Sequence, residues 1–387
     1  MSEPERKSRK PPNTAFKQQR LRSWQPILTP KAVLPTLFVL GAIFAPLGGL
    51  FLSLSEQVSE IYIDYTDCAA AGESPIPIPT EYYKFSIPSS EEKQIPIPTY
   101  KSNVVSLPNN PNNITAPKCT ISFNVHTNIN PPVYLYYELS NFYQNHRFYV
   151  KSLSYQQLKG DFKLNDSPQT DDALEASCKP LAYPNKDDRS VMYYPCGLIA
   201  NSVFNDTFTN ITGKGTDNKS YGFTEKGISL EADKNLFFKK RDYSYDSIVP
   251  PPFWADSYPN GKYTKEYPPP NLEEDEHLQV WFRTAGLPRF RKLYGKNNDD
   301  VLQAGTYEIE IYMKYNITDY GGRKAIVMST VGRFGGRNPS LGIAYITMGA
   351  ICVIAGIIFT ARHIYKPRKL GDHTYLSWTQ TQSSRAR

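Results

Sequence analysis

The stretch YPCGLIANSVFNDTF, residues 194–208, places Cys196 between a proline and a short apolar run. A cysteine can act as a nucleophile, bind a metal ion or form a disulfide. A zinc site would need histidines at ligand spacing, and His126, His146 and His277, in the central part of the chain, do not have it. The chemistry of Cys196 therefore depends on which side of a membrane the stretch lies.

No catalytic signature accompanies this cysteine. The sequence has no Walker loop, no Gly-x-Ser-x-Gly elbow, no His-Glu-x-x-His pair and no Asp-Lys-Thr-Gly segment of the kind that accepts phosphate in P-type pumps. The acidic run at residues 273–276 could supply carboxylates for glycoside hydrolysis, but adjacent residues rarely face each other across a substrate. A solvated loop is the simpler interpretation. We therefore predict that the chain is not an enzyme and has no catalytic residue, metal site or cofactor.

Two windows without a charged residue, 32–55 and 341–361, predict membrane-spanning helices. Each is longer than the roughly 20 residues that cross about 30 Å of hydrocarbon. The first window is too long for the apolar region of a signal peptide and begins after 31 residues, so we expect it to be retained.

Both tails outside these windows are basic. Residues 1–31 carry eight Lys or Arg and two Glu, and residues 362–387 carry six Lys or Arg and one Asp. The positive-inside rule therefore predicts that both tails are cytoplasmic. Residues 56–340 have a net charge of −4, so the pI near 8.9 comes from the tails. Such tails suit anionic lipid or an acidic partner and do not indicate nucleic acid.

The segment 56–340 is predicted to be a lumenal or extracellular ectodomain that is mainly β. Apolar and polar residues alternate at residues 121–126, 133–139 and 307–315. Strands that lie far apart in sequence favour an antiparallel sandwich, and a sheet pairing the two ends of the ectodomain would bring the spans together.

Two further segments have local signals. The Pro-rich segment 75–98 contains PIPIP at residues 75–79 and IPIP at residues 95–98, and predicts an extended strap over the sandwich. Residues 278–294 have mixed periodicity and predict a short helix that ends before Pro288.

Four cysteines lie between the two windows, and an even number in an oxidising compartment predicts two disulfides. They are Cys68, Cys119, Cys178 and Cys196. Three pairings are possible and the spacing does not choose among them. Sequential pairing would close loops of 51 and 18 residues, which the chain-entropy estimate values at about 4 and 3 kcal/mol. The fifth cysteine, Cys352, lies inside the second window and is interpreted as a packing residue.

Triplets of the form Asn-X-Ser/Thr, the acceptors of N-glycans, all fall between the two windows. They begin at Asn113, Asn165, Asn205, Asn210, Asn218 and Asn316. This placement agrees with a non-cytosolic ectodomain. Because Pro168 follows the Asn165 triplet, we predict glycans at the other five positions.

Small residues recur along one helix face of the first window. They are Gly41, Ala45, Gly49 and Ser53, and the second window offers Gly342, Gly349 and Gly356. Such a face permits close approach of another helix. Two interpretations stay open: the two spans pack on each other, or one face receives a helix of a partner.

Six long stretches, in order, connect the chain to a known family. They are residues 11–30, 141–150, 194–208, 248–261, 335–345 and 371–378. On these stretches the chain resembles the accessory (β) subunits of type IV P-type ATPases, the lipid flippases, in their fungal form.

The resemblance implies a two-span subunit that forms a heterodimer with a ten-span catalytic subunit, covers its exoplasmic loops and leaves the endoplasmic reticulum with it. It also implies disulfides between Cys68 and Cys119 and between Cys178 and Cys196, and a glycan at Asn205.

We therefore expect a non-catalytic chaperone and regulatory subunit that supports phospholipid translocation. It would be an integral membrane protein of the secretory pathway, with the Golgi, endosome or plasma membrane as destination and membrane lipids as neighbours. Lys17, Arg20 and Arg22 are predicted to contact acidic lipid or the cytoplasmic side of the pump. The alternatives are a glycosylated adhesion or receptor protein and, less favoured, an ectoenzyme.

Overall fold

The computed structural model describes residues 11–23, 28–88, 95–107, 110–163, 168–185, 187–213, 220–237, 243–332 and 335–367. Its contacts divide the chain into two units, which we call the helical unit (Met1–Leu52 with Ser340–Arg387) and the body (Ser53–Pro339). The acceptors Asn165 and Asn218 and most of the C-terminal tail lie outside the described residues.

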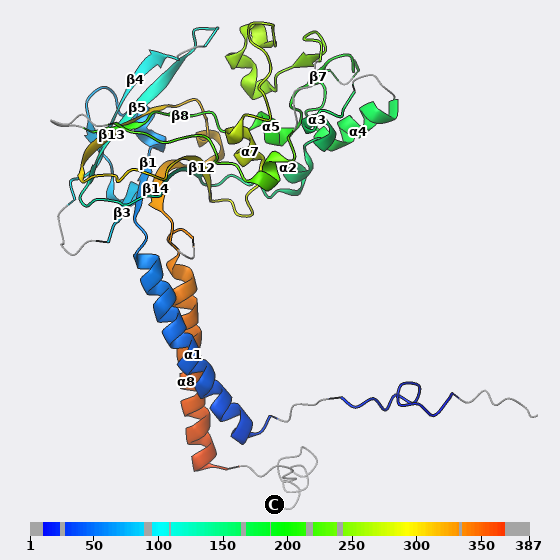
Figure 1. Ribbon diagram of the computed structural model, residues 1–387, viewed down its shortest axis with the longest axis vertical. Helices are drawn as coiled ribbons and strands as arrows, with labels where there is room; N and C mark the ends of the chain where they lie inside the picture. The colour runs from blue at the N-terminus through cyan, green and yellow to red at the C-terminus, as the bar shows by residue number, and fades with distance from the viewer. Residues whose placement is uncertain are drawn as a thin grey trace, which may run out of the picture. The chain divides into compact units, whose positions relative to one another are not determined.

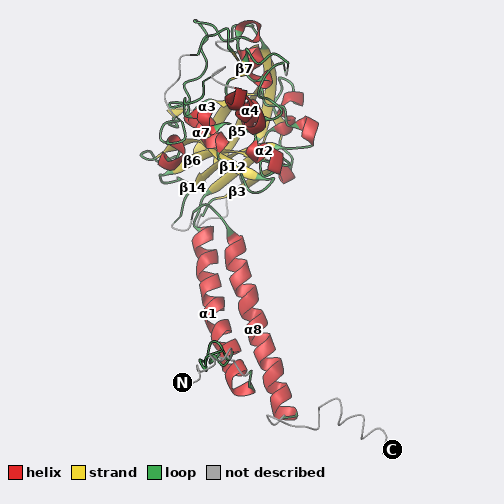
Figure 2. Cartoon of the chain, turned by 90° about the vertical axis from the view of Figure 1, so that its right-hand side faces the viewer, coloured by secondary structure: helices red, strands yellow, loops and turns green. Residues whose placement is uncertain are grey.

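The helical unit is built from two long helices, α1 (Pro30–Glu56) and α8 (Pro339–Tyr365), which lie side by side (Figures 1 and 2). Each has 27 residues, and their most apolar windows have mean hydropathies of 2.2 and 2.3. Both helices are long and apolar enough to cross a membrane. They contain the predicted windows 32–55 and 341–361 and extend beyond them at both ends.

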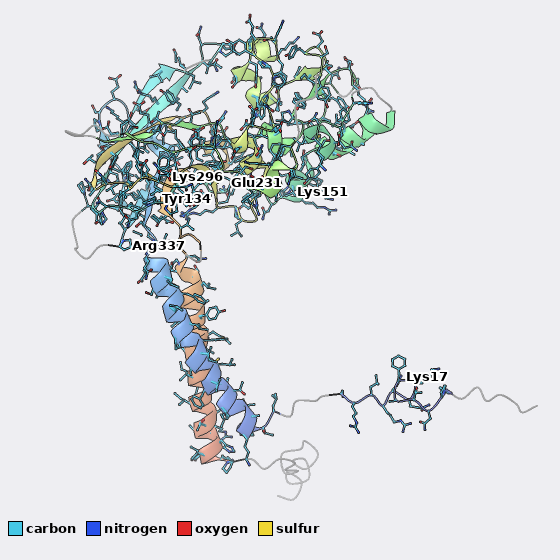
Figure 3. All side chains as sticks on the ribbon, in the orientation of Figure 1. Lys17, Tyr134, Lys151, Glu231, Lys296 and Arg337 are labelled. Atoms are coloured by element: carbon cyan, nitrogen blue, oxygen red, sulfur yellow. A yellow bond between two sulfur atoms is a disulfide. The ribbon has the colours of Figure 1, made fainter. Side chains whose placement is uncertain are left out.

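One antiparallel sheet of the body has five strands in the order β12-β6-β14-β1-β3. The strands are β1 (Glu60–Asp64), β3 (Tyr83–Ser86), β6 (Val133–Leu139), β12 (Phe290–Asn297) and β14 (Lys324–Thr330). Figure 3 labels Tyr134 and Lys296, which are partners across the β6–β12 ladder. The first and last strands of this sheet in sequence, β1 and β14, pair directly, with Glu60 opposite Ser329. The predicted pairing of the two ends of the body is confirmed.

A second antiparallel sheet has the order β10-β9-β13-β5-β4-β2, and β8 also pairs with β13. Its strands are β2 (Ile76–Pro77), β4 (Thr99–Ser106), β5 (Thr115–Val125), β8 (Thr207–Phe208), β9 (Ile211–Gly213), β10 (Ser220–Tyr221) and β13 (Gly305–Tyr312). Side chains of both sheets meet in one buried cluster, to which β1 contributes Ile61 and Ile63 and β5 contributes Ile121 and Phe123. The predicted antiparallel, mainly β architecture is therefore confirmed.

The Pro-rich segment is not a strap. Its first part, β2, pairs with β4 at one edge of the second sheet, whereas β3 pairs with β1 at one edge of the first. A proline has no N–H to donate to a ladder, which confines it to edge strands. The segment therefore passes from the edge of one sheet to the edge of the other; residues 89–94 lie outside the described part.

The body also has a helical lobe with its own buried cluster, which contains Cys178, Cys196, Leu158, Leu174 and Tyr194. Figure 1 shows its helices gathered at one end of the body, away from β4. The helices are α2 (Arg147–Lys151), α3 (Tyr155–Leu158), α4 (Pro168–Cys178), α5 (Leu198–Asn201), α6 (Glu231–Lys234) and α7 (Glu276–Phe282). A short parallel pair joins β7 (Met192–Tyr193) to β11 (Ile248–Val249).

The described residues of the body also form the 3-10 helices η1 (Thr66–Ala70), η2 (Thr80–Tyr82), η3 (Pro252–Ser257), η4 (Pro259–Gly261) and η5 (Thr318–Tyr320). The predicted helix before Pro288 is present as α7, and Asp275 caps its N-terminus by accepting a hydrogen bond from the Leu278 amide at 3.0 Å. The strand β12 in the second half of residues 278–294 was missed by the sequence analysis.

Candidate partner-binding surfaces

Cys196 is half of a disulfide. It joins Cys178 with a Cα–Cα distance of 5.7 Å, and Cys68 joins Cys119 at 5.9 Å. Both distances are ordinary for disulfides. The pairing is sequential, as the resemblance implied, and it leaves Cys352 as a buried free cysteine in α8.

The residue after Cys196 has to be glycine. Gly197 has a φ of +97°, and a Cβ at this position would lie 2.1 Å from the carbonyl oxygen of Ser152. The Ser152 hydroxyl donates to Lys179 O at 2.6 Å and accepts from the Leu198 amide at 2.9 Å. The disulfide loop is thus held against the end of α2, where no side chain fits.

The apolar run after Gly197 connects the helical lobe to the sandwich. Ile199 is fully buried, and its carbonyl accepts a hydrogen bond from the Trp281 indole at 2.9 Å. Phe204 stacks on Tyr137 of β6 with ring centroids 3.9 Å apart. The stretch 194–208 therefore starts in one buried cluster and ends in the other.

Asp206 is the polar centre of the end of this stretch that lies in the sandwich. Its Oδ1 accepts hydrogen bonds from the amides of Lys314 at 2.6 Å and Tyr315 at 2.7 Å. Its Oδ2 lies 2.7 Å from Lys324 Nζ and accepts from the Tyr65 hydroxyl at 2.9 Å. The Lys324 ammonium also donates to Tyr315 O at 2.7 Å. We call these residues the Asp206 network.

The network is buried, with side-chain exposures of 4% for Lys324 and 0% for Asp206. Burial, together with the neighbouring Asp206 carboxylate, raises the pKa of Tyr65 well above its ordinary value, so this phenol stays a donor. A buried ion pair needs such additional hydrogen bonds to offset its desolvation. In the sequence, residues 205–207 indicate only a glycan acceptor; the charged residue between Phe204 and Phe208 is the signal that could have indicated the network.

The predicted glycan acceptors differ in accessibility. Asn113, Asn210 and Asn316 are exposed. Asn205 is half-buried, and its Oδ1 is buried without a hydrogen-bond partner among the described residues. Glycans at Asn113, Asn205, Asn210 and Asn316 stay predictions, and Asn218 lies outside the described residues.

Glycines of α8 face α1 at close range. A Cβ at Gly342 would lie 2.8 Å from Leu52 N, and one at Gly349 would lie 2.9 Å from Ala45 N. Gly41 and Gly48 of α1 have equally little space. The first interpretation of the small residues, that α1 and α8 pack on each other, therefore describes this part of the structure.

The contact face of α1 differs from the predicted face. Gly41 and Ala45 lie on it, but Gly48 takes the place of Gly49, which has no atom within 4 Å of an added Cβ. Ser53 is likewise exposed. Each four-residue step turns by about 40° around a helix, so a strict four-residue repeat moves off any straight contact face. Gly49 and Ser53 thus belong to a side of α1 that α8 does not cover.

Lys17, Arg20 and Arg22 are exposed on the segment before α1, where Figure 3 labels Lys17. The Arg20 guanidinium donates to Asn13 Oδ1. Among the described residues these three basic side chains form no ion pair. Their contact with lipid or a partner stays a prediction.

Two segments of the body expose large apolar side chains: residues 141–148, a loop that runs into the first residues of α2, and the loop 284–288. Tyr143, Phe148 and Leu287 are 56%, 73% and 69% exposed. The loops are tied together, because Asn145 Nδ2 donates to Gly286 O at 2.9 Å and the Phe142 amide donates to Pro288 O at 3.1 Å. We call them the aromatic loops. Exposed apolar side chains that gather in one patch are typical of protein-binding sites.

The acidic run 273–276 is only partly solvated. Glu276 accepts hydrogen bonds from the amides of Gly227 and Ser229, both at 2.9 Å, and lies 3.4 Å from Lys234 Nζ. Burial raises the pKa of Glu276, but these amides and the lysine outweigh it and hold the pKa below its ordinary value. The run therefore fixes the loop before α6. Within the described part of the chain, no group of three or more His, Cys, Asp or Glu could hold a metal ion.

Comparison with known proteins places these features in a family. Residues 51–369 match the LEM3 (ligand-effect modulator 3) family, also called the CDC50 family. The phospholipid-transporting ATPase accessory subunit CDC50 of Chaetomium thermophilum is 38% identical over 396 residues, which cover 96% of this chain and 91% of the relative.

Relatives from other organisms match over a similar extent. The phospholipid-transporting ATPase accessory subunit CRF1 of Saccharomyces cerevisiae is 38% identical over 97% of this chain and 91% of its own. Cell cycle control protein 50A of Mus musculus is 37% identical over 93% of this chain and 91% of its own. The chain, with its two apolar helices and disulfide-bonded β body, belongs to the LEM3/CDC50 family.

Proposed function

We propose that the chain is a non-catalytic accessory subunit of a phospholipid flippase, and that it forms a heterodimer with a type IV P-type ATPase. The observation that carries this proposal is the match of nearly the whole chain to relatives named accessory subunits of phospholipid-transporting ATPases. In this function the partner hydrolyses ATP and moves the lipid. The chain stabilises the partner and accompanies it out of the endoplasmic reticulum.

The proposed topology places both tails in the cytoplasm and the body in the lumen. Two observations support it: the basic residues of both tails and the two disulfides of the body. The acceptors Asn113, Asn210 and Asn316 are exposed, so the lumenal glycosylation machinery could reach them.

Three surfaces are proposed to meet the ATPase. The aromatic loops would bind its lumenal loops, since unpartnered apolar side chains gain most from burial. The side of α1 with Gly49 and Ser53 would accept one of its membrane helices. Lys17, Arg20 and Arg22 would contact its cytoplasmic side. Each contact stabilises only the assembled state, by mass action.

Regulation would follow from the same contacts. A subunit shifts a pump between conformations only where its contacts differ between them. The body is suited to this task because its two clusters are joined by the stretch 194–208, and the Asp206 network fixes the end of this stretch to the sandwich.

The proposal is tested by purifying the epitope-tagged chain in mild detergent and identifying its partners by mass spectrometry. We expect a ten-span ATPase in near-equal amount. We also expect retention of the chain in the endoplasmic reticulum when the ATPase is absent. An ATPase that assembles, leaves the endoplasmic reticulum and hydrolyses ATP equally well without the chain would refute the proposal, and ATP hydrolysis by the chain alone would refute its non-catalytic part.

A further inference from the structure

The helical unit has a cavity of about 380 Å³ between α1 and α8, next to the two tails. It is lined by Leu28, Thr29, Pro30, Val33, Leu34, Phe359, Arg362, His363 and Lys366. Its origin lies in the helix packing. Glycines keep α1 and α8 in close contact as far as Gly356, where a Cβ would lie 3.0 Å from the Phe38 ring. No glycine brings the helices together before Phe38 in α1 or after Gly356 in α8, and the cavity lies between these parts of the two helices.

The lining changes character along the helices. Val33, Leu34 and Phe359 belong to the charge-free windows. Arg362, His363 and Lys366 follow directly after the second window. A change from apolar to basic at this point is typical of the boundary between hydrocarbon and headgroups, where basic pockets between membrane helices bind acidic lipid headgroups.

Among the described residues, the basic side chains of this cavity have no acidic partner. Residues 11–52 and 340–371 contain no Asp or Glu. Within the described residues, Arg362 and Lys366 form no ion pair. Two permanent cations that face one small cavity repel each other, so an anion supplied from outside the chain stabilises the arrangement.

We propose that this cavity binds one anionic phospholipid. Arg362 and Lys366 bind its phosphate, His363 adds a hydrogen bond, and Val33, Leu34 and Phe359 contact the upper part of its acyl chains. The volume accommodates a headgroup with its glycerol, not a whole lipid. This inference rests on the proposed topology, which places the cavity in the cytoplasmic leaflet, where acidic lipids concentrate.

The test uses the full-length chain, purified in detergent and examined by native mass spectrometry with added phosphatidylserine or phosphatidylcholine. We expect one retained phosphatidylserine and no retained phosphatidylcholine. The variant R362Q/K366Q should bind phosphatidylserine about 30-fold more weakly, since each basic residue contributes about fivefold. The control K84Q/K101Q removes the same charge from two exposed side chains of the body and should bind normally. Equal losses in both variants, or equal binding of the two lipids, would overturn the proposal.

A second variant separates a pocket from general attraction between charges. Val33→Trp fills the cavity and keeps every charge, so it should lose the lipid as R362Q/K366Q does; normal binding would refute the pocket. Glycerophosphoserine, which has the headgroup without acyl chains, should not compete at matched concentration. Competition by glycerophosphoserine would show that the site recognises a free phosphate group and not a lipid, and would overturn the proposal. Co-purification of the ATPase is measured in parallel, so a failed accessory function and a failed lipid site give different results.

Discussion

Replacement of Asp206 by Asn tests the polar network that fixes the stretch 194–208 to the sandwich. The new amide group would face Lys324 Nζ and the Tyr65 hydroxyl, which are both donors and lie 2.7 and 2.9 Å from Asp206 Oδ2. Breaking a buried ion pair by removing one partner costs about 3 to 5 kcal/mol. Asp206→Asn should therefore destabilise the body by about 4 kcal/mol.

Replacement of the other member of the ion pair, Lys324→Met, should destabilise the body less than Asp206→Asn does. Without the lysine, the Asp206 carboxylate keeps three donors: the Tyr65 hydroxyl and the amides of Lys314 and Tyr315. The carboxylate stays hydrogen-bonded, and Tyr315 O loses one donor. We expect Lys324→Met to lower the free energy of unfolding by about 2 kcal/mol, close to the cost of one buried unsatisfied group. The double variant should be more stable than Asp206→Asn alone, because it removes the unpaired ammonium.

The assay is thermal unfolding of the full-length protein in detergent, followed by near-ultraviolet circular dichroism. A loss of about 4 kcal/mol corresponds to a fall in Tm of roughly 10 °C for a body of this size. Asp206→Asn keeps an Asn-X-Thr triplet at Asn205, so the acceptor is unchanged. Lys118→Met is the matched control: it breaks a half-exposed pair with Glu310 at 2.9 Å and should cost less than about 1 kcal/mol. A larger cost for Lys324→Met than for Asp206→Asn would show that the hydrogen bonds do not determine the stability of the network.

Three further predictions address other parts of the molecule. Cys196→Ser should leave Cys178 as a free thiol, which a thiol reagent labels after unfolding because the side chain is buried, and should lower the yield of mature protein, since closure of the 18-residue loop contributes about 3 kcal/mol; normal maturation without a free thiol in the unfolded protein would contradict it. Gly48→Leu should separate α1 from α8, because a Cβ there would lie 2.7 Å from Ile346 N, whereas Gly49→Leu should leave this packing intact and, if the exposed side receives a helix, reduce ATPase co-purification. Glu276, whose pKa is lowered in the folded state, contributes stability that is fully present above pH 4.5 and is lost as the pH falls below it; Glu276→Gln should therefore have a lower Tm than wild type at pH 7, and a difference that persists at pH 3 would refute this linkage.

The sequence predicted the elements that depend on local pattern. The charge-free windows became α1 and α8, and strict alternation at residues 133–139 became β6 with the same bounds. Its errors have physical reasons. A four-residue repeat suggested Gly49 as a contact. Four residues turn about 40° further than a full helical turn, so the repeat moves away from the contact face, and Gly48 faces α8 instead. The prolines of residues 75–98 suggested a strap, but the segment forms edge strands, and its Pro77 lies in β2 at a sheet edge, where a missing N–H is tolerated.

The candidate surfaces depended on tertiary contacts that no local pattern contains. Asp206 has donors from Tyr65, Lys314, Tyr315 and Lys324, which come from distant parts of the chain. The aromatic loops come together through hydrogen bonds between residues more than 140 positions apart. A charged residue in an apolar run shows that its side chain must have hydrogen-bonding or ionic partners within the fold. Which residues these are depends on the register of strands that pair across the whole body.

The burial of the Asp206 network bears on how such a subunit could act. Tyr65 directly follows β1 and Lys324 begins β14, the two strands nearest to α1 and α8 in the sequence. Both donate to the same carboxylate, which lies on the stretch fixed to the helical lobe by the disulfide of Cys196. A body ordered in this way before assembly loses little conformational entropy on binding. More of its contact energy therefore remains to distinguish one conformation of the pump from another, which is what regulation by an accessory subunit requires.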